Sequence, residues 1–184
     1  MNGPTDAFGS TEDWIEIYNP TGAAVDISGF FISDKSGNPL KWTVPAGVSV
    51  PAGGYQMVFC SKRDTYTGGE LHPSFSLTQT KNEWIILSNN LGNIIDSIHI
   101  VNMTKEDHSV GRSSNGALDW KLFTTPTPGA ANIGAVDFYT PAPVMDLAPG
   151  FHAGQQTVTI TCPDAGATIH YTLDGSTPTG LSAV

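Results

Sequence analysis

Asp13 and Glu16 are the two acidic residues paired within a recognisable motif, and paired carboxylates are what the hydrolysis of sugars requires. A glycoside hydrolase holds two carboxyl groups about 5 to 10 Å apart, and one of them has a raised pKa. The odd spacing of Asp13 and Glu16 places them on opposite faces of an extended segment. We therefore expect no catalytic residues and predict that the chain is not an enzyme.

Other reactive side chains are scattered along the chain. There is no Gly-x-Ser-x-Gly nucleophile elbow. The five histidines do not repeat at the spacing of metal ligands, and we interpret all of them as surface residues: His72, His99, His108, His152 and His170. These patterns predict no metal centre and no cofactor.

One segment faintly resembles a calcium loop. Asp34-Lys-Ser-Gly-Asn38 places oxygen-bearing side chains at alternate positions, as in the early half of such a loop. Pro45 stands where the closing acidic residue is required, so a polar turn is the preferred interpretation. Calcium bound by residues far apart in the sequence stays open.

Tryptophan side chains stack on sugar rings when they lie on an exposed face. Trp84 lies in the most apolar strand candidate, and we expect it in the core. Trp14, Trp42 and Trp120 lie near strand ends beside polar neighbours, which makes them the candidate glycan-binding residues. Burial is the preferred interpretation, and glycan contact by these three residues is the alternative.

Charge and hydropathy exclude two classes of partner. The net charge is −9 with only 8 lysine and arginine residues, which disfavours binding to a phosphate backbone, so we expect no nucleic-acid partner. No run of about 18 apolar residues is present, so we expect no membrane-spanning segment. The first residues lack the basic and apolar parts of a secretory signal. The two cysteines, Cys60 and Cys162, end strand candidates and are predicted to be buried free thiols.

The elements that must position these residues are strands. Ile15 and Ile17 fall on one face of an extended segment, and Asn19-Pro20 ends it. The runs 83–87 and 94–100, joined by the turn at 89–93, predict a hairpin at the centre of a sheet. With Gly 20, Pro 13 and no long amphipathic helical stretch, the chain is predicted to be all-β.

A change of pattern divides the chain. Residues 133–143 have no sustained period and contain Pro141 and Pro143, which favours a linker between a domain at 1–132 and a second domain at 144–184. The second domain offers two strand candidates, 155–162 and 167–173. Because an independent sandwich needs more strands, we expect this domain to be partial.

Six short motifs, in order, resemble the bacterial lamin-tail family over about 10–132: Asp13-Trp-Ile-Glu-Ile-Tyr-Asn-Pro20, Val25-Asp-Ile-Ser-Gly-Phe30, Ile32-Ser-Asp34, Lys41-Trp42, Val50-Pro-Ala-Gly-Gly-Tyr55 and Thr124-Thr-Pro-Thr-Pro-Gly-Ala-Ala-Asn132. The resemblance implies an immunoglobulin-like β-sandwich and a non-catalytic module of larger secreted or surface-bound proteins. Family members usually have an additional apolar strand before the first motif, and residues 1–12 contain no such run. We therefore expect an incomplete sheet edge.

The segment from Gln155 to Thr179 resembles the C-terminal domain of chitobiases and β-hexosaminidases, and the string Tyr-Thr-x-Asp-Gly-Ser-Thr-Pro is its most distinctive part. This resemblance implies a truncated accessory β-sandwich without the catalytic barrel of those enzymes. The whole chain is then expected to be an immunoglobulin-like β-sandwich followed by a partial second β-sandwich.

The function expected from these resemblances is a non-catalytic adaptor, tethering or interaction module of a bacterial secreted or cell-surface protein. Its partner is expected to be a protein or a cell-envelope glycan. The alternative is a carbohydrate-binding accessory module of a glycoside hydrolase of the chitobiase or hexosaminidase type.

Overall fold

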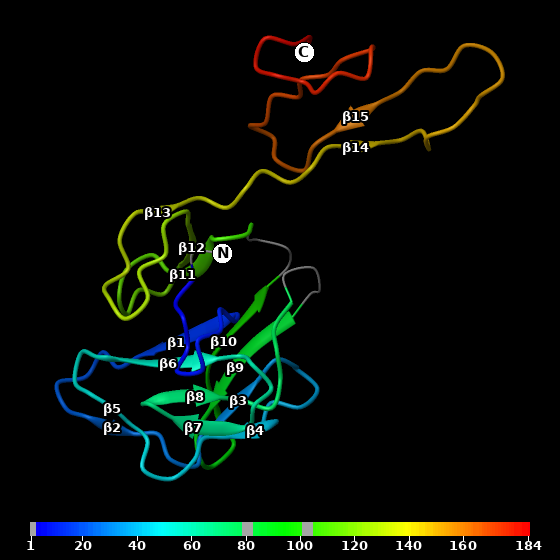
Figure 1. Cartoon of the computed structure of the whole chain (residues 1–184). Coiled ribbons are helices and arrows are strands. Elements are labelled where there is room, and N and C mark those ends of the chain that lie inside the picture. The colour runs from blue at the N-terminus through cyan, green and yellow to red at the C-terminus, as the bar shows by residue number, and fades with distance from the viewer. Residues whose placement is uncertain (1–2, 79–82, 101–104) are drawn as a thin grey trace. The chain divides into compact units, whose positions relative to one another are not determined.

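Figure 1 shows the computed structural model of the chain, which describes residues 3–78, 83–100 and 105–184. These residues form strands joined by turns, and no helix occurs among them. The prediction of an all-β fold is therefore confirmed. Nothing in the described ranges is a helix long and apolar enough to cross a membrane.

Two compact units make up the chain, Met1–Phe138 and Tyr139–Val184, called the first and second unit below. The division falls inside the segment 133–143 that the sequence marks as a linker. Ala135–Val136 within that segment forms β13 and pairs with β12 (Trp120–Phe123). The start of the expected linker is thus a strand of the first unit, because its backbone completes a ladder beside Leu122 and Phe123.

Two four-stranded sheets build the first unit. One has the order β1-β6-β8-β7, and the other has the order β10-β9-β3-β4. Their bounds are β1 (Trp14–Tyr18), β6 (Tyr55–Phe59), β8 (Glu70–His72), β7 (Thr65–Thr67), β10 (Ile94–Ile100), β9 (Glu83–Ser88), β3 (Phe31–Ser33) and β4 (Trp42–Thr43). β6 and β8 run parallel, whereas the other pairs in these two sheets are antiparallel. β1 lies at one end of its sheet. The incompleteness of this edge relative to other family members stays a prediction.

The hydrophobic core lies between these sheets. Val58 and Leu71 come from the first sheet, and Ile32 and Trp42 from the second, and all four belong to one buried cluster. Ile15 and Ile17 of β1 pack against the same cluster, as their alternation predicts. Side chains alternate between the two faces of a strand, so Phe59 beside Val58 and His72 beside Leu71 lie on the face of this sheet that points away from the core.

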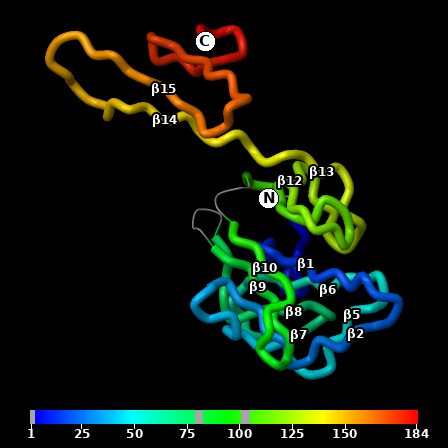
Figure 2. Tube along the Cα trace, turned by 180° about the vertical axis from the view of Figure 1, so that it is seen from behind, coloured from blue at the N-terminus to red at the C-terminus, as the bar shows by residue number. Residues whose placement is uncertain are grey.

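The hairpin predicted from the sequence is present. β9 and β10 pair antiparallel, with Gly92 at positive φ in the turn between them (Figure 2). β9 lies inside its sheet, but β10 lies at the edge, so the predicted central position is right for β9 alone.

Smaller sheets complete both units. β2 (Val25–Asp26) pairs with β5 (Ser49–Val50), and β11 (Ser109–Arg112) pairs with β12. In the second unit β14 (Val144–Met145) pairs with β15 (Ile160–Thr161).

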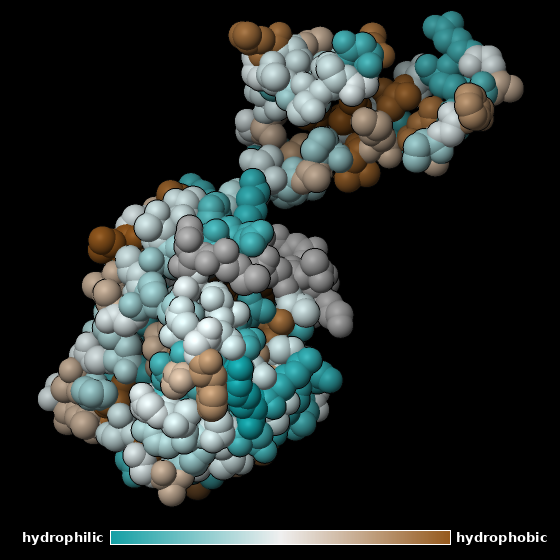
Figure 3. Space-filling view, in the orientation of Figure 1, coloured by the Kyte–Doolittle hydropathy of each residue, from teal (hydrophilic) through white to brown (hydrophobic). Residues whose placement is uncertain are grey.

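The second unit has less regular structure than its sequence predicts. Of the expected strand 155–162 only β15 is a strand, and of 167–173 only Tyr171 forms a bridge, with Ala183. Figure 3 shows apolar residues at the surface of this unit. None of its residues, all of which are described, joins the buried hydrophobic core. Without a core to bury them, alternating side chains do not enforce long strands.

Candidate functional site

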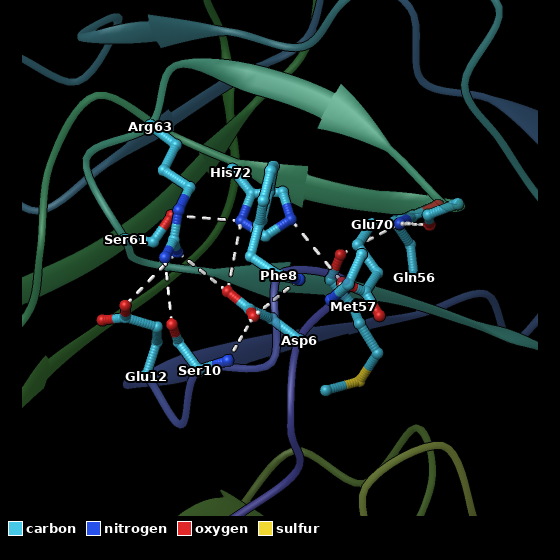
Figure 4. Close-up of polar contacts among 12 residues, drawn as sticks. Asp6, Phe8, Ser10, Glu12, Gln56, Met57, Ser61, Arg63, Glu70 and His72 are labelled. Atoms are coloured by element: carbon cyan, nitrogen blue, oxygen red, sulfur yellow. Dashed lines mark hydrogen bonds and ion pairs between the residues drawn. The ribbon is translucent and has the colours of Figure 1, made fainter.

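A cluster of polar contacts lies on the outer face of the β1-β6-β8-β7 sheet (Figure 4). It joins residues 3–12, called the N-terminal segment, to β8 and to the loop that follows β6. Leu71 of β8 points into the core, and its neighbours Glu70 and His72 therefore reach the outer face. The loop after β6 holds Lys62 and Asp64 at positive φ, a strained conformation for residues other than glycine.

His72 lies at the centre of the cluster and is 0% exposed. Its ring lies between the rings of Phe8 and Phe59, at centroid distances of 5.1 and 5.8 Å. Nδ1 is 3.0 Å from the Ser61 hydroxyl, while Nε2 has no hydrogen-bond partner in the described structure and lies 3.6 Å from a Glu70 oxygen. The interpretation of this histidine as a surface residue was wrong, because the N-terminal segment covers it.

Asp6 holds the turn of the N-terminal segment. Its buried carboxylate accepts hydrogen bonds from the backbone N–H groups of Phe8 and Ser10, at 3.0 and 2.8 Å. The other carboxylate oxygen lies 2.9 Å from the guanidinium of Arg63. Arg63 also contacts the Ser10 hydroxyl and lies over the Phe8 ring at 4.5 Å. A single arginine thus connects the segment to the loop after β6.

The cluster contains the ingredients of a nucleophile and a base, since the Ser61 hydroxyl and His72 Nδ1 are within hydrogen-bond distance. The acidic neighbours are already engaged: Asp6 accepts from three donors, and Glu70 accepts from the Ala7 N–H at 2.7 Å. Asp6 and Ser61 both lie beside His72 Nδ1, with Asp6 at 4.0 Å. In a catalytic triad the acid lies beside the ring nitrogen opposite the one that contacts the nucleophile. Glu70 and the Asp6–Arg63 pair therefore hold the N-terminal segment against β8 and the loop after β6.

Asp13 and Glu16, the two acids considered in the sequence analysis, do not belong to this cluster. Glu16 of β1 accepts a hydrogen bond from the Gly129 N–H, which joins β1 to the loop after β12. Burial raises the pKa of Glu16, and this hydrogen bond opposes part of the rise. Asp13 precedes β1, and its carbonyl accepts from the Cys60 N–H at 2.7 Å.

The tryptophans differ from one another in accessibility. Trp42 is 6% exposed, and its indole N–H donates to Asp64 at 2.7 Å, so its assignment as a glycan-binding residue is wrong: the core covers its ring. Trp84 is only partly buried and stacks on His99 at 4.7 Å, which corrects its expected place in the core. Trp14 and Trp120 are partly exposed, and Arg112 lies 4.0 Å from the Trp120 ring centre. Glycan contact by Trp14 and Trp120 stays a prediction.

The segment that resembles a calcium loop forms a turn. The Asn38 N–H donates to the Lys35 carbonyl at 3.2 Å, and Asp34 forms an ion pair with Lys41 at 2.6 Å. Across the described ranges no group of three or more histidine, cysteine or acidic residues is placed to hold a metal ion.

Both cysteines are free thiols, as predicted. Cys60 is buried in the core, and burial together with the carboxylates of Asp13 and Asp34 raises the pKa of its thiol far above the usual range. Cys162 is only partly buried, contrary to expectation, and its thiol lies 3.4 Å from the Pro141 carbonyl oxygen.

The sequence pattern did not reveal the cluster around His72. The alternation in β8 already separates Leu71 from its neighbours, but it does not show what covers the outer face. The sequence offered one signal for the segment that covers this face. Asp6, a residue type common in turns, lies two positions before the aromatic residue Phe8.

Comparison with known proteins identifies both parts of the chain. The profile of the Lamin Tail Domain matches residues 1–102, and that of the chitobiase/beta-hexosaminidase C-terminal domain matches residues 147–184. These matches confirm the two resemblances, and both families are accessory rather than catalytic types of domain. A protein named endoglucanase, from Clostridium saccharobutylicum, is 41% identical over 61 residues, which is 33% of this chain and 13% of the endoglucanase. No solved structure matches the chain.

Proposed function

The chain belongs to the lamin tail domain family, and from this premise we propose that it is a non-catalytic adaptor or tethering module of a bacterial secreted or cell-surface protein. The observation that carries the proposal is the arrangement of two compact units in one chain, each of which contains the match to a family of accessory domains. Such an arrangement suits a protein that displays or spaces neighbouring domains.

The chemistry of the first unit supports this role. The polar cluster around His72 holds the N-terminal segment on the sheet, and its members Asp6, Glu70 and His72 contact other residues of the first unit. The acidic net charge of −9 favours solubility and disfavours nucleic acid as a partner. The partner is then a protein or a cell-envelope glycan.

Binding of the purified chain to envelope fractions tests the proposal. A fluorescently labelled chain is titrated against bacterial envelope preparations, with and without protease treatment of the envelope. Saturable binding supports the tethering role, and its loss after protease treatment identifies a protein partner. Hydrolysis of a polysaccharide that survives repurification and disappears on Glu16→Gln or Asp13→Asn contradicts the non-catalytic role.

A carbohydrate-binding accessory role in a glycoside hydrolase is the second candidate. The similarity to an endoglucanase and the match of residues 147–184 to a domain named after chitobiase favour it. Calorimetric titration with chitin fragments and other polysaccharides tests it. Saturable binding would support it. Loss of that binding in Trp14→Ala or Trp120→Ala would place the binding surface on the first unit.

A further inference from the structure

A shallow groove on the second unit combines apolar and polar side chains. Tyr171, Thr172, Leu173, Asp174, Ser176 and Ser182 line it. Tyr171 is 37% exposed and Leu173 is 95% exposed, so both present apolar surface to solvent. A concave surface that combines apolar side chains with a few placed polar groups has the composition of a small-ligand site.

Two short turns hold the groove in shape. In the first, Asp174 Oδ1 accepts from the backbone N–H and the hydroxyl of Ser176, at 3.0 and 2.6 Å, and Gly175 adopts positive φ. In the second, the Ser182 hydroxyl accepts from the Thr179 N–H at 2.9 Å. The Tyr171 N–H donates to the Ala183 carbonyl at 2.9 Å and so joins the two turns side by side. The polar groups of the groove are thus pre-positioned by backbone hydrogen bonds.

One carboxylate oxygen of the groove is unused. Both hydrogen bonds of Asp174 go to Oδ1, and Oδ2 has none within the described structure. These bonds from Ser176 lower the pKa of Asp174, so the carboxylate is ionised at neutral pH. A free, oriented carboxylate oxygen accepts hydrogen bonds from hydroxyl groups and repels anions.

We propose that this groove binds a neutral saccharide, with the C–H face of a sugar ring against Tyr171 and Leu173 and with its hydroxyl groups donating to Asp174. The aromatic ring and the leucine supply apolar contact, and the carboxylate supplies orientation. The carboxylate and the net charge of −9 exclude acidic polysaccharides. The inference rests on the second candidate function, carbohydrate binding, and gives it a site on the second unit.

We would titrate the whole chain with cellohexaose and with chitohexaose and monitor binding by changes in NMR chemical shifts. We expect saturable binding of at least one of them, and a loss of about tenfold in affinity for Tyr171→Ala and for Asp174→Asn. Leu173→Ser changes a side chain that is almost fully exposed, so it probes the groove without disturbing the fold. Phe151→Ser, at a fully exposed aromatic residue that does not line the groove, is the matched control and is expected to bind normally.

The outcomes separate the site from the function. In one outcome, Trp120→Ala or Trp14→Ala abolishes binding and all three groove variants bind normally. This outcome supports carbohydrate binding and overturns this site. Absence of binding to both oligosaccharides overturns the site together with the second candidate function. Equal affinity for polygalacturonate overturns the assignment of a neutral ligand.

Discussion

The Asp6 carboxylate lies 2.9 Å from the Arg63 guanidinium, although 57 positions of sequence separate the two residues. The pair fastens the N-terminal segment over His72, whose ring is fully buried. The residues before β1 therefore contribute contacts to the first unit in addition to those of the strand itself.

Replacing Asp6 by alanine is expected to destabilise the first unit by about 1–3 kcal/mol, because two backbone N–H groups and a partly exposed guanidinium lose their acceptor. Urea unfolding followed by tryptophan fluorescence measures the change. Asp137→Asn, which breaks an ion pair whose carboxylate is almost fully exposed, is the matched control and should leave the midpoint unchanged. Equal effects of the two substitutions would contradict the role of Asp6.

Replacing Trp42 by alanine is expected to cost about 3–5 kcal/mol, because a buried indole leaves a cavity and Asp64 loses a donor. Trp120→Ala, at a partly exposed position, is expected to cost less. Thermal unfolding of the two variants gives the comparison. A Trp42 variant as stable as the wild type would show that the indole is not part of the core.

Glu16 is expected to lower the stability of the first unit as the pH rises above 4.5, the ordinary pKa of a glutamate side chain. Its folded-state pKa is raised by burial, so the ionised form is less favourable in the folded chain than in the unfolded one. The loss begins near the unfolded pKa and is complete above the raised folded pKa. Glu16→Gln removes this dependence, so the variant should gain stability relative to the wild type between pH 4 and pH 7. Denaturant midpoints of the wild type and of Glu16→Gln at several pH values measure the difference in stability between them. A difference that does not change with pH would contradict the prediction.

Cys60 is expected to resist thiol reagents in the folded chain, because the thiol is buried and its raised pKa keeps it protonated. Cys162 is partly exposed and should react first. Titration with a chromogenic disulfide is expected to count one thiol in buffer and two in guanidinium chloride. Two thiols reacting at the same rate in buffer would exclude a buried Cys60.

Sequence reasoning succeeded where a pattern is local. The alternation of Ile15 and Ile17 placed one face of β1 against the core, and the turn at 89–93 placed the hairpin of β9 and β10. Both depend on a period of two residues and on short turns, which neighbouring residues specify by themselves.

It failed where burial depends on a distant segment. His72 was expected at the surface and Trp84 in the core, and the structure corrects both. Phe8 covers His72, and Trp84 is only partly buried and stacks on His99. In the second unit, alternation over 167–173 predicted a strand, yet only Tyr171 makes a bridge.

By itself, then, the sequence determined the all-β class, the strands around Ile15 and the two families to which the parts of the chain are similar. The tertiary structure decided which outer-face residues are covered, above all His72 beneath the segment that Asp6 and Arg63 hold. The reason is physical: a strand's period shows that a side chain leaves the core face, but whether water or protein meets it depends on contacts between residues far apart in the chain.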